Sequence, residues 1–260
     1  MTIGLRINEE IDLQLNNTIS DFGKLKFEVR EFLKQTSSFI EVNEFQIKDM
    51  VKESHYVVTH EGDDYDFYGM DTASYWFPIT LRNSIFVSLY AFLEHILIKI
   101  CRILEKTKGL STSIESFKND TNIKGPTIET ARMYITNVAG INFPNQSPEW
   151  RYMKKCTILR NSIVHNFAHV NDKVAMKLPM NGVTTKIEDV ANEVVGYNYF
   201  EDFGEGASKF GFENSFFLLS GFSEHFLRSF AILLNKFFRM NISLLDGRYD
   251  KEHASFDFRV

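Results

Sequence analysis

The sequence has little cysteine and no surplus of basic residues, and each shortage excludes a class of protein. Only Cys101 and Cys156 occur among 260 residues, so a disulfide-rich secreted scaffold is excluded. Both fall on apolar helical stripes, where we expect buried, reduced thiols. The net charge of -5 and the isoelectric point near 5.8 argue against a protein that binds nucleic acid over a broad basic surface. A local basic site is still compatible with this balance.

Long apolar runs without charge are also missing. The two most apolar regions, 85–101 and 216–238, are interrupted by charged residues, which predicts core helices and not membrane spans. The first residues show no charged leader followed by an apolar segment and a small-residue cleavage site, so we expect a cytoplasmic protein. No glycine-rich phosphate loop of the P-loop type occurs, and ATP hydrolysis therefore has no support.

What the sequence does contain is a large supply of apolar residues with helical spacing. Hydrophobic residues make up 44% of the chain and include 25 Phe, which is enough for a large core. Apolar residues recur at spacings of three and four in the segments 20–35, 42–57, 81–106, 127–138, 150–170 and 214–240. This period is typical of amphipathic helices. We therefore predict a mainly α fold built as a helical bundle.

The remaining segments subdivide this helical chain. We predict an N-terminal helical extension over 1–75, packed on a helical domain over 76–260. Between 171 and 212 the helical pattern fails, and we expect an insertion of strands and loops there. Its strands are predicted over 173–178 and 182–187. The small β element is therefore expected at the periphery of the bundle.

The most informative motif lies on the predicted helix over 150–170. Arg160, Asn161 and His165 put a permanent cation, an amide and a proton-transfer group on one helix. Asn161 and His165 are four residues apart and therefore share a face. The long stem and planar fork of Arg160 could bind a phosphate through two parallel hydrogen bonds. Since a neutral imidazole can accept or donate a proton near physiological pH, the motif indicates phosphate chemistry.

Structural roles are also open to these residues. The predicted helix over 81–106 carries Glu94 in its middle. A carboxylate inside an apolar run needs a partner, and Arg160 is the best candidate. Glu94 is therefore expected to be supporting, and more structural than catalytic. Asn161 could orient His165 or simply satisfy a helix end. Arg160 and His165 could themselves close a polar gap between helices.

Other cations on the motif helix leave two interpretations. Arg151, Lys154 and Lys155 lie within one stretch of that helix. They could contribute to a local site for RNA, or they could form an ordinary solvated helix face.

A metal site is a further alternative for the same helix. His165 and His169 have the spacing of helical zinc ligands, and Glu94 or His95 could complete a site. Such a site would make the protein a metal-dependent hydrolase. The sequence contains no H-E-x-x-H motif, and we predict neither a metal nor a cofactor.

The motif residues also carry a resemblance to a known family. The stretch 159–166 resembles the R-x4-6-H motif of the HEPN superfamily, in its common form with Asn after the Arg. The stretch 88–95 looks like the earlier acidic helix of such domains, and the similarity covers about 80–240. The resemblance implies a HEPN-like helical bundle that often dimerises so that two motifs face each other. It implies in many members a metal-independent endoribonuclease that serves as a toxin or in phage defence, whereas other members keep the fold without demonstrated cleavage.

Motif and resemblance together define the expected function. We expect a metal-independent endoribonuclease that cleaves RNA by 2′-hydroxyl attack, with Arg160 and His165 catalytic and with Asn161 and Glu94 supporting. A two-fold dimer would supply a second His165, so that one imidazole acts as base and the other as acid. The expected partners are RNA, a second copy and an antitoxin or defence-system protein, but no membrane. The alternative is a non-catalytic HEPN-like module that binds a nucleotide or a protein in the same pocket.

Overall fold

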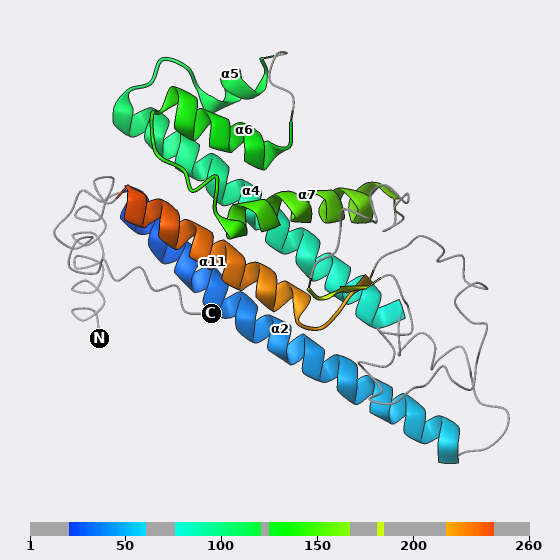
Figure 1. Ribbon diagram of the computed structural model, residues 1–260. Coiled ribbons are helices and arrows are strands. Elements are labelled where there is room, and N and C mark those ends of the chain that lie inside the picture. Colours follow the sequence, from blue (N-terminus) through cyan, green and yellow to red (C-terminus); the bar gives the residue numbers. More distant parts are fainter. Residues whose placement is uncertain (1–20, 61–75, 121–124, 167–180, 185–216, 242–260) are drawn as a thin grey trace, which may run out of the picture. The chain divides into compact units, whose positions relative to one another are not determined.

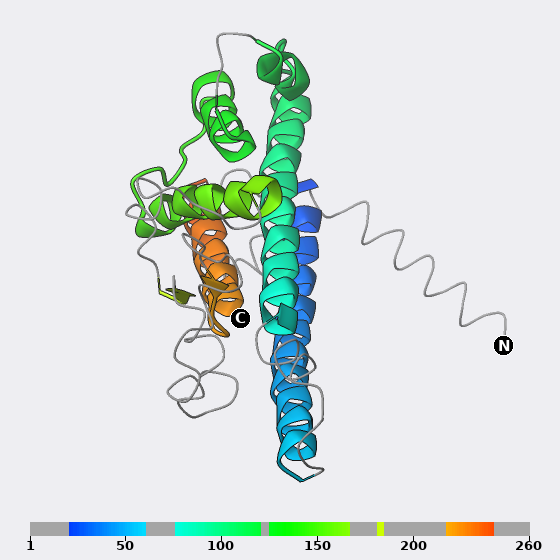
Figure 2. The same ribbon diagram turned by 90° about the vertical axis from the view of Figure 1, so that its right-hand side faces the viewer.

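The computed structural model of the protein describes residues 21–60, 76–120, 125–166, 181–184 and 217–241. These residues are mainly helical (Figures 1 and 2), which confirms the predicted mainly α class. The chain divides into two compact units. Unit 1 comprises Met1–Gln35, Leu93–Trp150 and Phe230–Val260, and unit 2 comprises Thr36–Phe92 and Arg151–Ser229.

Long helices contribute residues to both units. The helices are α2 (Asp21–His60), α4 (Phe77–Lys108), α5 (Ile114–Lys118), α6 (Thr127–Met133), the π-helix η2 (Tyr134–Val138), α7 (Pro148–Asn166) and α11 (Phe222–Met240). The strands are β1 (Val183–Thr184) and β2 (Phe217–Leu218). The predicted extension over 1–75 contributes α2, and its boundary near residue 75 stays a prediction.

Helix α2 corrects one expectation from the sequence. Two helices were expected over 20–35 and 42–57, but the structure has one continuous helix from Asp21 to His60. The intervening residues include neither Gly nor Pro, so nothing in the chain breaks the helix. Leu33, Ile40 and Ile47 recur every seven residues and are all buried, which carries the apolar stripe through the supposed gap.

The ends of two other helices follow from local chemistry. Helix α4 begins at Phe77, before the predicted start at residue 81. Pro78 is compatible with this early start, because an N–H in the first turn of a helix has no partner within the helix and its absence costs nothing. Helix α5 occupies a segment in which no helix was expected. The Ser113 side chain caps it by accepting a hydrogen bond from the Ser116 N–H at 3.0 Å.

In unit 1, ion pairs fix the direction of α4 against α2. Lys106 near the end of α4 pairs with Asp21 at the start of α2, at 2.9 Å. Lys99, two turns earlier in α4, pairs with Glu28, two turns later in α2. The two helices therefore run antiparallel in this unit, as Figure 1 shows.

Helix α11 packs against α2 in the same unit. The rings of Phe22 and Phe238 meet edge to face, with centroids 6.2 Å apart. Phe22 lies in the first turn of α2 and Phe238 in the last turn of α11, so these helices are also antiparallel (Figure 1).

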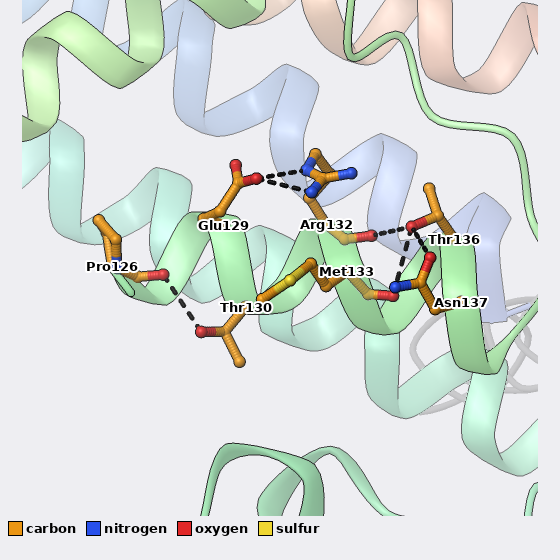
Figure 3. Close-up of polar contacts among 7 residues, drawn as sticks. All are labelled: Pro126, Glu129, Thr130, Arg132, Met133, Thr136 and Asn137. Atoms are coloured by element: carbon orange, nitrogen blue, oxygen red, sulfur yellow. Dashed lines mark hydrogen bonds and ion pairs between the residues drawn. The ribbon is translucent and has the colours of Figure 1, made fainter. Parts of the chain in front are cut away.

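The junction between α6 and η2 is held by local side-chain bonds (Figure 3). Arg132 donates from Nε and Nη2 to one oxygen of Glu129, at 2.8 and 2.6 Å. The Thr136 hydroxyl donates to the Arg132 carbonyl at 3.0 Å. Such back-bonding from a hydroxyl to the preceding turn often bends a helix, and here it accompanies the wider turn of η2.

A buried cation joins three elements of unit 2. Arg82 of α4 is only 2% exposed, and its Nε and Nη2 donate to the two carboxylate oxygens of Glu44 in α2, at 2.9 and 2.7 Å. Its Nη1 donates to the carbonyl of Leu218 in β2 at 3.3 Å. A buried charge is tolerated only when it is paired and hydrogen-bonded in this way.

Aromatic packing forms the core of unit 2 and orients α7. The ring of Phe86 lies edge-on to Phe222 and Phe226, with centroids 5.1 and 5.5 Å away. The Tyr90 hydroxyl lies 2.7 Å from the Thr157 hydroxyl. This buried bond connects α4 to the middle of α7.

The small sheet is present and pairs β1 with β2. Val183 of β1 lies antiparallel to Leu218 of β2, and the strand predicted over 173–178 lies outside the described residues. Residues 217–218 were expected to be helical, and α11 instead begins at Phe222. Gly182 precedes β1 with a φ of +79°, and a Cβ there would lie 3.1 Å from the Phe222 Cβ. Only glycine fits this position without strain.

Helix α4 is the most apolar of the long described helices by mean hydropathy. Within the described residues, α4 is long and apolar enough to cross a membrane by length and composition alone, yet half of its apolar window is buried inside the protein.

Cys101 and Cys156 are buried and unbridged, as predicted. Burial raises the pKa of the Cys101 thiol to about 12 and that of Cys156 well above its usual range.

Candidate functional site

Helix α7 presents the candidate residues because its opposite side is fixed in the core. Met153, Cys156 and Leu159 of this helix are fully buried. Its first turn is capped by the Ser147 hydroxyl, which accepts a hydrogen bond from the Trp150 N–H at 3.1 Å. With one stripe held inward, Asn161 and His165 are exposed to solvent.

Arg160 and Asn161 are brought together by a direct hydrogen bond. The Arg160 Nη1 donates to the Asn161 Oδ1 at 3.1 Å. Among the described residues, the buried Nε–H of Arg160 has no hydrogen-bond partner. Leaving a buried donor unsatisfied costs about 1–3 kcal/mol. Arg160 as a whole is half-buried, and its positive charge could pair with an anion such as a phosphate.

His165 completes the group from the last turn of α7. It lies one turn beyond Asn161, about 6 Å further along the helix axis, on the same face. Arg160 is five residues before His165 and would by itself point elsewhere. Because its guanidinium reaches Asn161, its charge lies toward the face that carries the imidazole. Chemically, a phosphate on this face could meet both a cation and a proton-transfer group.

The predicted role of Glu94 stays a prediction. Glu94 is half-buried on α4 and belongs to unit 1. Arg160 belongs to unit 2, so the proposed ion pair between the two joins residues of different units.

The metal alternative also remains a hypothesis. His169 lies outside the described residues. Within the ranges that the structure does describe, no group of three or more His, Cys, Asp or Glu side chains is placed to hold a metal ion.

The structure adds a histidine that sequence reasoning did not connect with α7. His225 of α11 is exposed, and its ring lies edge-on to Tyr152 of α7, with centroids 4.9 Å apart. Tyr152 is thirteen residues before His165, or about 20 Å along the helix, so His225 does not join the Arg160 group. Burial raises the pKa of the Tyr152 hydroxyl far above its usual range, and this side chain therefore acts as a neutral packing group.

Comparison with known proteins gives no relative from which residue roles could be transferred. The assignment of the site rests on the helix face and on the contacts of Arg160. No protein-family model, no curated protein and no solved structure matches the chain.

Proposed function

We propose that the protein is a HEPN-like, metal-independent endoribonuclease that cleaves RNA at the group formed by Arg160, Asn161 and His165. The observation that carries this proposal is the state of the Arg160 guanidinium. It is held by Asn161 at 3.1 Å, and its buried Nε–H has no partner among the described residues. An exposed imidazole follows on the same helix face. A phosphodiester can pair with this cation and supplies the reaction on which the imidazole can act.

The reaction uses groups that RNA itself provides. The 2′-hydroxyl oxygen attacks the neighbouring phosphorus, the O2′–P bond forms, and the bond from phosphorus to the 5′-oxygen breaks. One imidazole takes the 2′-proton, and a protonated imidazole gives a proton to the leaving 5′-oxygen. Arg160 stabilises the negative charge that builds on the non-bridging oxygens. The products are a 2′,3′-cyclic phosphate and a 5′-hydroxyl, and none of these steps requires a metal ion.

A second copy of the chain supplies the second imidazole. One His165 cannot readily serve as base and acid in the same turnover. In two copies related by a two-fold axis, one His165 would act as the general base and the other as the general acid. Val164, next to His165, is a large apolar side chain that is 45% exposed. If the two α7 ends meet at that axis, this side chain becomes buried in the interface. The toxin or defence role, the cytoplasmic location and an antitoxin or defence-system partner belong to this proposal.

Paired substitutions test the proposed site. General acid–base catalysis is worth about 10² to 10⁴ in rate, so His165→Ala is expected to lower RNA cleavage by at least that factor without unfolding the protein. Arg160→Ala is expected to do the same. His225→Ala and Arg239→Ala are matched controls, because they remove an exposed histidine and an exposed arginine from helix α11.

The outcomes separate catalysis from structure. If both site variants keep full cleavage, or if both unfold in a thermal melt, the motif is a structural pair and the proposal is wrong. If the purified protein binds a nucleotide or a protein at Arg160 but never cleaves RNA, it is instead the non-catalytic module.

A further inference from the structure

Helix α7 concentrates positive charge in a protein whose net charge is -5. After Glu149 in the first turn, the helix contains no Asp or Glu through Asn166. The same stretch contains Arg151, Lys154, Lys155 and Arg160. An acidic protein that places so many cations without one anion on a single helix creates a local positive potential there.

Three of these cations share the helix face of the candidate site. Arg151, Lys154 and Lys155 are all exposed. With 3.6 residues per turn, they fall with Asn161 and His165 in a sector of about 120° around the helix. Lys154 precedes His165 by eleven residues, or about 16 Å along the axis. The three side chains, hereafter the basic row, therefore lead along one face to the imidazole.

The described surroundings of the basic row supply no neutralising charge. In the parts of the chain that the structure describes, no carboxylate pairs with Arg151, Lys154 or Lys155. Glu149, the acidic residue nearest in sequence, is engaged by Lys236 of α11 at 2.6 Å. The row therefore keeps the capacity to exchange its counterions for phosphates.

We infer that the basic row binds the phosphates of a single-stranded RNA. The placement of the cleaved phosphate of this RNA at Arg160 and His165 rests on the proposed function. A line of cations on one helix follows one phosphate backbone, whereas double-stranded RNA is bound across successive grooves of the duplex. The half-buried apolar Ile158 lies on the same face, between the row and Asn161. It offers a contact surface for a base between the phosphate contacts. The span from Arg151 to His165 is about 21 Å along the helix axis, which corresponds to a few nucleotides next to the cleaved bond.

Salt-dependent binding tests the inference directly. The full-length protein is titrated against a fluorescent 2′-O-methyl RNA strand, which lacks the attacking hydroxyl and stays intact. The test variant is Arg151→Gln/Lys154→Gln/Lys155→Gln. The control is Lys24→Gln/Arg30→Gln/Lys34→Gln, which removes the same charge from exposed positions on α2. A single strand contributes about 0.7 to the slope of log affinity against log salt for each neutralised phosphate.

The test variant is therefore expected to lose about 2 from that slope, and to bind the strand more weakly than the wild type. The control variant is expected to keep the wild-type slope. Equal losses in both variants would show that only total charge matters, and an unchanged slope in the test variant would show that the row does not contact RNA. Binding of polyglutamate in preference to the strand would assign the row to an acidic protein. Each of these results overturns the inference.

Kinetics distinguish this inference from the proposed function. With a cleavable strand, the test variant is expected to raise KM more than it lowers kcat, because the row binds flanking nucleotides and not the reacting atoms. If the wild type binds RNA through the basic row but does not cleave it, the proposed function is wrong and the inferred RNA binding is supported. If cleavage depends on His165 and the test variant has a wild-type KM, the inferred RNA binding is wrong and the proposed function is supported.

Discussion

Replacement of Arg82 by methionine is expected to destabilise unit 2 strongly. Arg82 is 2% exposed, and it makes two bonds to Glu44 and one to the Leu218 carbonyl. Its removal leaves the carboxylate of Glu44, which is 16% exposed, without its bidentate partner. Breaking a buried ion pair at one side costs about 3–5 kcal/mol. In a chain of this size each kcal/mol lowers the melting temperature by about 2–4 °C, so a loss of roughly 6–20 °C is expected.

Thermal unfolding of matched variants checks this reasoning. Arg82→Met/Glu44→Leu removes both charges and is expected to recover a large part of the lost stability, because no buried charge is then unpaired. Arg228→Met breaks the exposed pair with Glu224 on α11 and is expected to cost less than about 1 kcal/mol. If Arg82→Met melts like Arg228→Met, or if the double variant is as unstable as the single one, the buried pair does not hold α2 to α4 as described.

Thiols, a first-turn carboxylate and the dimer give further measurements. Because burial raises the pKa of Cys101 and Cys156, neither is expected to react with a thiol reagent at pH 8 until the protein is unfolded; rapid reaction of the native protein would contradict this. Burial raises the pKa of Glu149, but hydrogen bonds from Lys236 and its own helix turn outweigh this and lower it below the usual value. The stabilisation by ionised Glu149 is present above its unfolded-state pKa and is lost as the pH falls through its folded-state pKa. Glu149→Gln should therefore lower the melting temperature at pH 7 and differ less from wild type near pH 3. A difference in melting temperature that is the same at both pH values would refute this. Sedimentation at micromolar concentration should give twice the 30.2 kDa chain mass, and Val164→Glu should give a monomer without cleavage; a monomeric wild type would remove the composite site.

The helices could largely be predicted because their signals are local. The buried stripe of α7 follows from spacings of three and four, and its start follows from the Ser147 cap. The supposed break in α2 was wrong because a few polar residues lower helix propensity only slightly, whereas Ile40 in the gap is buried and maintains the stripe. Local sequence could not show this, since burial of Ile40 depends on tertiary packing.

Contacts between distant residues could not be predicted. The partner of β1 is β2, more than thirty residues later, and the sequence favoured a helix over residues 217–218. The pair between Arg82 and Glu44 spans 38 residues, and nothing in either local pattern indicates it. At the candidate site, the residue types and the shared face of Asn161 and His165 follow from sequence. The bond from Arg160 to Asn161 does not, because it depends on the side-chain rotamers.

Cleavage of RNA in excess EDTA is the most direct test of the proposed function. The purified full-length chain is incubated with a single-stranded RNA, and mass spectrometry identifies the new ends. We expect a 2′,3′-cyclic phosphate and a 5′-hydroxyl, and we expect that replacing the attacking 2′-hydroxyl with hydrogen abolishes cleavage at that bond. Loss of cleavage in EDTA with recovery on adding zinc, or cleavage that survives the 2′-deoxy replacement, would contradict the roles given to Arg160 and His165.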